Sequence, residues 1–171
     1  MRVLVTYASR YGATAGIAER VAETLTLAGL ETEVREIDDV EDVARYSAVV
    51  LGSAVYFGSW LKAATAFVEE NRGLLGDRPV WLFSSGPLPG AVLPEEQDAD
   101  PTPKDVAALA EALHARDHRV FEGALDPGRL TFRDRLIRAT PAGRPLLPEV
   151  DGRDWAAIRA WATGIARDLA A

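Results

Sequence analysis

The chain has 171 residues with 26 acidic and 19 basic side chains, a net charge of −7 and no cysteine. This acidic balance argues against general nucleic-acid binding, which needs a basic face. The lack of cysteine excludes disulfides and thiolate chemistry. The length predicts one domain over residues 1–171. No signal peptide and no apolar run of about 18 residues is visible, so we expect a cytoplasmic protein without a transmembrane segment.

Apolar periodicity predicts strands that alternate with helices along the chain. Apolar or alternating runs indicate strands over residues 3–7, 31–37, 48–52, 79–83 and 118–125. Apolar residues at helical spacing indicate helices that begin near Ala15 and after caps at Ser59, Thr102 and Asp151. The first of these helices is expected to end at Gly29. Residues 126–150 interrupt the alternation and form an insertion before the last helix.

Five strands that alternate with helices predict an α/β fold, a doubly wound parallel sheet with helices on both faces. The expected strand order is 2-1-3-4-5, in three α/β/α layers. Such folds bind ligands at the carboxyl ends of the strands beside the switch point, which here lies between strands 1 and 3. Loops 9–14, 53–60 and 84–90 follow strands 1, 3 and 4, so we expect them to meet at one rim.

The first loop, Ser9-Arg10-Tyr11-Gly12-Ala13-Thr14, has the parts of a phosphate cradle. The helix that follows offers unpaired N–H groups and the positive end of its dipole, and Gly12 permits close approach. The loop lacks the lysine of nucleotide triphosphatases and the glycine pattern of dinucleotide-binding turns, so it suits one phosphate monoester, as in FMN. We expect all six residues to hold this phosphate. The alternative is a plain connection in which Ser9 and Thr14 only cap the helix.

The second loop carries Tyr56, Phe57 and Trp60 around Gly58, and the third carries two serines, Gly86 and a proline-rich stretch. Aromatic side chains at a loop tip suit a flat ligand such as an isoalloxazine ring. The expected flavin contacts are Ala54, Val55, Tyr56, Phe57 and Gly58 on one side, and Ser85, Gly86 and Pro87 at the ring edge or the ribityl chain. Alternatively, the aromatic side chains pack onto the next helix. No protein residue is expected to be catalytic, because the flavin carries the chemistry. We also expect no metal site, since the two histidines, His114 and His118, have no clear carboxylate neighbours.

The pattern Val5-x-Tyr7-x-Ser9-x-x-Gly12-x-Thr14 is similar to the FMN phosphate-loop signature of flavodoxins, with Thr6 where an apolar residue is usual. The stretch 52–58 resembles the second loop of the short-chain flavodoxin-like protoporphyrinogen dehydrogenases, which pass electrons to quinones. Tyr56 stands where that family has a basic residue. These resemblances imply a flavodoxin-like fold, FMN as the cofactor and, for the narrower family, a quinone as the electron acceptor.

Residues 127–147 contain five arginines and one acid, Asp134, within an acidic chain. This segment resembles the basic amphipathic insertion that the protoporphyrinogen dehydrogenases carry before their last helix, but it is shorter and broken by prolines. Its chemistry suits the propionates of a porphyrin, an anionic membrane surface or an acidic partner. Alternatively, the arginines pair with the chain's own acids. The candidate substrate or partner contacts are Arg129, Arg133, Arg135 and Arg138.

The leading hypothesis is an FMN-binding protein that passes electrons or hydride through the flavin to a redox partner or from a flat small molecule. One variant is an enzyme that oxidises a substrate such as protoporphyrinogen, with a quinone as acceptor. The other is a general electron carrier, for which Glu95, Glu96, Asp98 and Asp100 could supply an acidic rim. A cofactor-free binding or regulatory module of the same fold is a third alternative. The sequence leaves weak peripheral membrane contact and the oligomeric state open.

Overall fold

A computed structural model describes residues 1–89 and 102–171. Within this part of the chain, the main sheet has parallel strands in the order β2-β1-β3-β5-β6. Their bounds are Arg2–Ala8 for β1, Glu31–Glu36 for β2, Ala48–Tyr56 for β3, Val80–Ser85 for β5 and Asp117–Phe121 for β6. The predicted order 2-1-3-4-5 is therefore confirmed for the parallel strands. A short strand, β4 (Ser59–Trp60), which the periodicity did not predict, pairs antiparallel with the end of β3.

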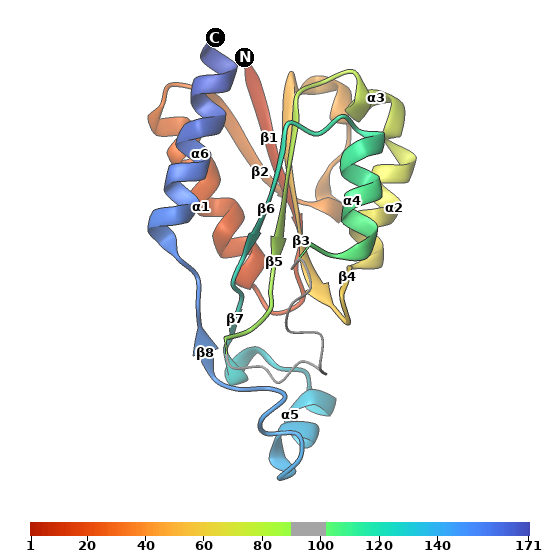
Figure 1. Ribbon diagram of the computed structural model, residues 1–171, viewed down its shortest axis with the longest axis vertical. Coiled ribbons are helices and arrows are strands. Elements are labelled where there is room, and N and C mark those ends of the chain that lie inside the picture. The colour runs from red at the N-terminus through yellow and green to blue at the C-terminus, as the bar shows by residue number, and fades with distance from the viewer. Residues whose placement is uncertain (90–101) are drawn as a thin grey trace.

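The helices cover both faces of the sheet (Figure 1), which confirms the predicted three-layer architecture. Helices α1 (Ala13–Leu27) and α6 (Trp155–Ala170) lie together on one face. Helices α2 (Lys62–Glu70), α3 (Arg72–Gly76) and α4 (Lys104–Ala112) lie on the other. Two short 3-10 turns, Ile37–Asp39 and Val43–Arg45, follow β2 in the acidic stretch between the second and third strands.

A hydrophobic core lies on each face of the sheet. The core under α1 and α6 contains Phe83 and Trp161, whose ring centroids lie 6.0 Å apart in an edge-to-face arrangement. Gly52 on β3 makes room for this cluster, because a Cβ there would lie 2.0 Å from Cζ of Phe83. The second core lies between the opposite side of β1, β3 and β5 and the helices α2 and α4. Strands β3 and β5 are thus buried on both faces, as their continuous apolar runs predicted.

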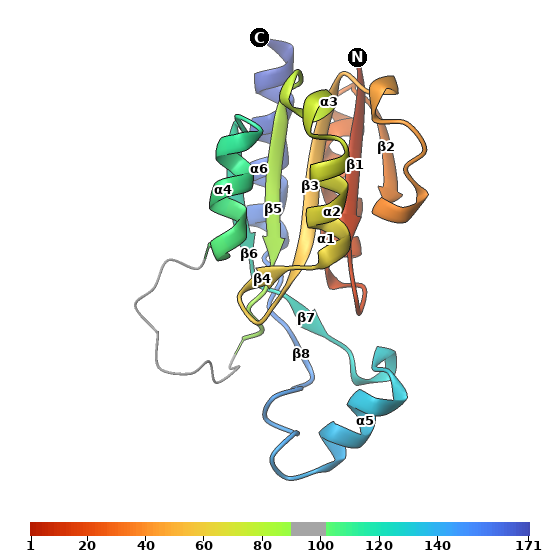
Figure 2. The same ribbon diagram turned by 90° about the vertical axis from the view of Figure 1, so that its right-hand side faces the viewer.

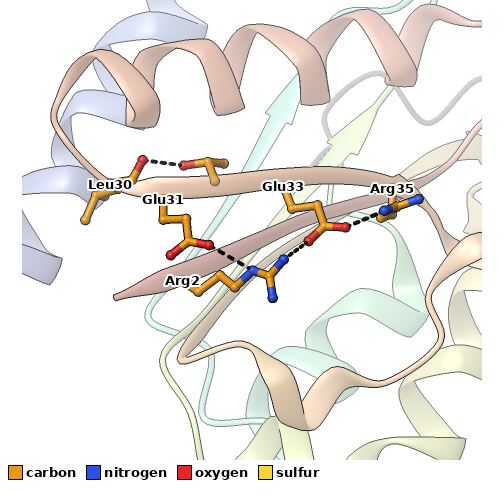
Figure 3. A network of polar contacts seen from close by, with 6 residues as sticks. Arg2, Leu30, Glu31, Glu33 and Arg35 are labelled. Carbon is orange, nitrogen blue, oxygen red and sulfur yellow. Dashed lines mark hydrogen bonds and ion pairs between the residues drawn. The ribbon is translucent and has the colours of Figure 1, made fainter.

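The edge strand β2 is joined to β1 by a network of charged side chains (Figure 3). Arg2 on β1 lies 3.3 Å from Glu31 and donates to Glu33 at 2.9 Å. Glu33 in turn accepts from Arg35 at 2.6 Å. These exposed pairs add specificity to the register of the edge rather than much free energy, because water screens them.

The insertion before the last helix leaves the sheet after β6 and returns through a small antiparallel ribbon. Strand β7 (Ala124–Leu125) pairs with β8 (Val150–Asp151), so the strand predicted over residues 118–125 is divided in two. Between them lie a 3-10 turn, Pro127–Arg129, and helix α5 (Phe132–Ala139). Figure 2 shows α5 extending beyond the carboxyl ends of the strands, at the end of the molecule opposite both termini.

Three predicted helix starts differ from the structure. Ser59 does not cap a helix but lies in β4, and α2 begins after Leu61. Helix α4 begins after Pro103, one residue later than a cap at Thr102 would place it. The last helix is capped by Asp154, whose carboxylate accepts from the N–H groups of residues 156 and 157, because Asp151 is engaged by Arg153 in the β8 turn. Only the last helix exchanges one capping side chain for another of similar strength, because α2 and α4 begin after Leu61 and Pro103 without a side-chain cap.

Candidate functional site

The turn after β1 leads directly into the N-terminus of α1. Gly12 stands at the N-cap with φ of +88°, a conformation that favours glycine. Its N–H donates to the Ser9 hydroxyl at 3.0 Å, while no side chain caps the N-terminus of α1. The first N–H groups of this 15-residue helix therefore remain available, with the positive end of the dipole behind them.

Thr14 supplies the clearest sign of a ligand site in this turn. Its side chain is 1% exposed, and its hydroxyl oxygen has no hydrogen-bond partner among the described residues. A buried hydroxyl without a partner costs about 1–3 kcal/mol, which an oxygen-rich ligand would recover. The Thr6 hydroxyl on β1 is also unpaired, but Thr14 lies in the first turn of a helix, where an anion binds best. The residues at this position therefore fit a phosphate.

Arg129 of the insertion lies directly on Gly12. A Cβ built on Gly12 would stand 2.0 Å from Nη1 of Arg129, so the guanidinium occupies the space that a side chain would take. Both residues line a groove of about 660 Å³ that runs from the turn along the first turns of α1, between that helix and residues 124–129 and 153–155. Arg129 was predicted from the sequence as a substrate or partner contact, and the structure brings it to residues 9–14, the phosphate turn.

Helix α5 is tied to the same turn through Asp134. The Tyr11 hydroxyl donates to the Asp134 carboxylate, which also accepts from the Thr131 hydroxyl at 2.8 Å. Arg10 lies 3.6 Å from the same carboxylate oxygen. The hydrogen bond from Tyr11, followed by that from Thr131, lowers the pKa of Asp134. Burial and the bond to this carboxylate raise the pKa of Tyr11.

Arg10 connects the first loop to the second. Its guanidinium lies 5.4 Å from the ring centroid of Tyr11 and 5.1 Å from that of Tyr56, which is a cation–π geometry. Burial raises the pKa of the Tyr56 hydroxyl, so this ring is the sheltered part of the second loop. The expectation that Arg10 binds phosphate stays a prediction, and its present partners are two rings and one carboxylate.

The second loop is a tight hairpin between β3 and β4. Tyr56 pairs with Ser59, and the two residues between them have positive φ, +51° for Phe57 and +75° for Gly58. Two-residue turns of this hand match the twist of the flanking strands. The Phe57 side chain stands at the tip and is fully exposed.

Trp60 belongs to the core. For this aromatic side chain, the structure therefore supports the alternative that it packs within the protein and does not cover a flat ligand. Its side chain is 4% exposed, and its indole N–H donates to the Ser84 hydroxyl at 2.8 Å. Ala54 in β3 is also buried. Phe57 and Tyr56, by contrast, do not enter the core.

The third loop lies beside the second. Ser85 is the buried last residue of β5, and Gly86 follows with φ of +128° and a cis bond to Pro87. A Cβ on Gly86 would lie 3.6 Å from Cβ of Val55, which places the two loops in contact distance. The Gly86 N–H donates to the carbonyl of Phe121 at 2.9 Å and so ties the loop to β6.

The strand register brings the three loops to one rim, as the topology predicted. Ala8 at the end of β1 pairs with Ser53, and Ala54 pairs with Ser85 at the end of β5. Residues 9–14, 53–60 and 84–89 therefore all emerge at the carboxyl ends of adjacent strands.

The other candidate arginines of the insertion do not line the groove beside Gly12. Arg135 donates to the carbonyl of Gly128 at 2.7 Å, and Arg138 donates to the carbonyl of Leu147 at 2.9 Å. These bonds fold the insertion onto itself, and they involve carbonyls rather than the acids considered as alternative partners. Arg133 lies on α5, where Phe132 and Leu136 are also exposed. The role of Asp134 was not predicted from the sequence, although it is the one acid beside five arginines in residues 127–147.

Across residues 1–89 and 102–171, no group of three or more histidine, cysteine, aspartate or glutamate side chains is arranged to hold a metal ion. His118 lies on β6, with Nε2 2.9 Å from the Ser84 hydroxyl. In the same part of the chain, no helix is long and apolar enough to cross a membrane. The acidic residues Glu95, Glu96, Asp98 and Asp100, proposed as a carrier's rim, lie outside the described residues.

The sheet order, the uncapped helix after β1 and the aromatic hairpin after β3 define a doubly wound α/β protein with a turn suited to an anion at its switch point. A family model described as "Flavodoxin domain" matches residues 4–141. The chain belongs to this family, which confirms the resemblance seen in the turn.

Curated relatives match over part of the chain. An NAD(P)H dehydrogenase (quinone) of Cupriavidus metallidurans is 30% identical over 95 residues, which cover 43% of this chain and 48% of the relative. A protoporphyrinogen IX dehydrogenase [quinone] of Escherichia coli K12 is 27% identical over 86 residues, which cover 49% of this chain and 48% of the relative. The chain thus spans about half the length of the curated relatives it matches.

Solved structures of flavodoxins share the fold. An archaeal flavodoxin aligns with a TM-score of 0.64 at 14% identity and covers 100% of both chains. Oxidised flavodoxin 2 of Bacillus cereus aligns with a TM-score of 0.65 at 18% identity, covering 98% of this chain and 99% of that one.

Proposed function

We propose that this chain is an FMN-binding redox protein that transfers electrons or hydride through the flavin. The observation that carries the proposal is the buried, unpaired Thr14 hydroxyl at the uncapped N-terminus of α1. Membership of the flavodoxin-domain family supports it. The cofactor supplies the redox chemistry when bound, and the protein supplies binding, orientation and electrostatics.

The turn after β1 would hold the phosphate. The Thr14 hydroxyl and the free N–H groups of the first turn of α1 are donors that belong to the same helix turn. The Ser9 oxygen already accepts from Gly12, but its hydroxyl hydrogen remains able to donate to a phosphate oxygen. Gly12 keeps the backbone bare at this point, which permits close approach.

The hairpin 55–58 and the loop 85–87 would hold the ring. Phe57 is fully exposed at the hairpin tip, and covering such a side chain gains about 1.5–3 kcal/mol. Val55 and Gly86 lie in contact across the two loops, so a flat ligand above them would touch both. Water would be excluded from the covered face, and backbone groups of both loops would orient the polar edge.

We further propose that the electron acceptor is a quinone, and that the donor is a flat reduced molecule of the porphyrinogen kind. The names of the two quinone-linked relatives support this reading. The exposed Phe132, Arg133 and Leu136 on α5 support it as well, because they offer apolar and cationic contacts near the rim. The alternative is a general electron carrier, and the tests must distinguish it from a quinone-linked enzyme.

The proposal is tested on the purified protein. We expect the flavin absorbance bands, release of FMN on denaturation and, if the protein is purified without flavin, reconstitution by added FMN. A colourless protein that FMN does not reconstitute would contradict the proposal and favour a cofactor-free module. Once loaded and reduced, the protein should be reoxidised anaerobically by a water-soluble quinone such as menadione. Reoxidation by a one-electron carrier protein but not by menadione would favour the carrier.

A further inference from the structure

Arg129 has a fixed backbone at the start of the insertion. Its N–H donates to the carbonyl of Asp126 at 3.0 Å, and the Asp126 carboxylate accepts from Gly128 at 2.8 Å. Arg135 on α5 closes the same turn through its bond to the Gly128 carbonyl at 2.7 Å. These hydrogen bonds fix the backbone from which the Arg129 guanidinium reaches the phosphate turn, although the side chain itself is exposed.

The electrostatics of this position call for an anion. The guanidinium rests on Gly12, at the N-terminus of α1, where the helix dipole disfavours a cation. Among the described residues it has neither an ion pair nor a side-chain hydrogen bond. The other arginines that line the groove are paired, Arg153 with Asp151 at 2.6 Å and Arg20 with Glu23 at 3.0 Å. Arg129 and the helix N-terminus thus bring two unmatched positive groups to one point.

We propose that Arg129 binds the phosphate of the flavin cofactor, so that the insertion completes the cofactor site. This inference rests on the proposed function. Thr14 and the first turn of α1 would approach the phosphate from the helix, while Arg129 approaches from the insertion across Gly12. A planar guanidinium can donate two parallel hydrogen bonds to a phosphate and also neutralises its charge.

The contacts of α5 join the insertion to the phosphate turn. The Asp134 carboxylate accepts from Tyr11 and pairs with Arg10, both of which belong to the phosphate turn. The insertion that carries Arg129 is therefore held to the residues it would help to close. Cofactor binding and the position of the insertion are coupled, because the same two segments, the turn at residues 9–14 and the insertion, serve both.

The experiment compares FMN with riboflavin, which has the same ring and no phosphate. The dissociation constants of both flavins are measured by quenching of flavin fluorescence, using the apo-proteins of wild type and Arg129→Gln. We expect Arg129→Gln to weaken FMN binding by about 10- to 100-fold, as for loss of a hydrogen bond to a charged group, and to leave riboflavin binding unchanged. Arg144→Gln removes an equally charged, exposed residue of the insertion that does not line the groove, and it should change neither constant. Thermal unfolding of each apo-variant shows that it is folded.

A second probe separates this inference from the proposed function. Inorganic phosphate should raise the unfolding temperature of wild-type apo-protein and do so less for Arg129→Gln. If wild type binds FMN but the ratio of FMN to riboflavin affinity is the same in Arg129→Gln, the role of Arg129 is refuted while the proposed function stands. Equal loss of both flavins would also refute it, since that result marks a general effect on the site. If wild type binds neither flavin, the proposed function fails and this assignment fails with it.

Discussion

The Tyr11 hydroxyl donates to the Asp134 carboxylate and so joins the turn after β1 to helix α5, 123 residues further along the chain. Thr131 and Arg10 bind the same carboxylate, so one side chain receives three contacts from two segments. This single acid fixes the insertion over the carboxyl end of the sheet.

Tyr11→Phe should loosen the insertion without unfolding the sheet. The substitution keeps the ring near Arg10 and Tyr56 but removes the donor to Asp134. We expect faster amide hydrogen exchange over residues 131–139 and unchanged exchange in β1 and β3. Tyr7→Phe is the matched control, because its hydroxyl lies on β1 near Glu36 rather than at the insertion. Equal protection of α5 in both variants would show that Asp134 is not the tether.

The link should also depend on pH. The pKa of Asp134 is lowered from its ordinary 3.8, so its contribution is present above about that value and is lost as pH falls through the lower folded value. The pKa of Tyr11 is raised from 10.0, so its contribution is complete below that value and is lost as pH rises through the higher folded value. We expect the amide NMR signals of α5 to be unchanged from pH 5 to 9 and to shift in acid.

Asp134→Asn serves as the control for this titration. An amide oxygen still accepts from Tyr11 but does not ionise, so the acid transition of α5 should disappear. An unchanged transition in Asp134→Asn would assign it to another group.

Thr14→Val should weaken FMN binding without lowering the stability of the apo-protein. The substitution keeps the shape but removes a buried hydroxyl that has no partner, so the apo-protein should be as stable as wild type or more stable. FMN affinity should fall by about 1–3 kcal/mol, because the phosphate loses a donor. Thr6→Val removes the other unpaired threonine hydroxyl and should leave FMN affinity unchanged. Titration calorimetry and denaturant unfolding measure the two effects, and equal affinities in the two variants would exclude Thr14 from the phosphate site.

Gly52→Ala should destabilise the fold from within the core. Its Cβ would lie 2.0 Å from Cζ of Phe83 in a close-packed aromatic cluster. Overpacking of this kind costs about 1–3 kcal/mol, read as a lower midpoint in urea. Gly164→Ala, in open space on α6, should instead be neutral or stabilising by up to about 1 kcal/mol. A stable Gly52→Ala variant would mean that the Phe83 ring can shift without cost.

The layers, the strand order and the meeting of three loops could be predicted from the sequence, because they follow from local periodicity and from the geometry of parallel strands. Val49 and Leu82 belong to apolar runs that only a sheet buried on both faces accommodates. The Thr14 hydroxyl was expected in the turn because strand and helix patterns bracket it. Such signals extend over a few residues and do not require knowledge of distant contacts.

The parts that could not be predicted depend on pairs distant in sequence or on competition between neighbours. Nothing near Asp134 indicates that Tyr11 will bind it, and nothing near Arg129 indicates Gly12. Trp60 was grouped with the loop aromatics, but its partner Ser84 lies on another strand. Asp154 was overlooked as a cap because Asp151 stands three residues earlier with the same chemistry.

The central claim is that the rim formed by the three loops binds FMN. The most direct measurement is a fluorescence titration of apo-protein with FMN, at fixed FMN and increasing protein. The account predicts saturable quenching with one FMN per chain, and weaker binding of riboflavin because it lacks the phosphate that Thr14 and the helix N-terminus receive. Absence of quenching with folded wild-type protein, or equal affinity for FMN and riboflavin, would contradict it.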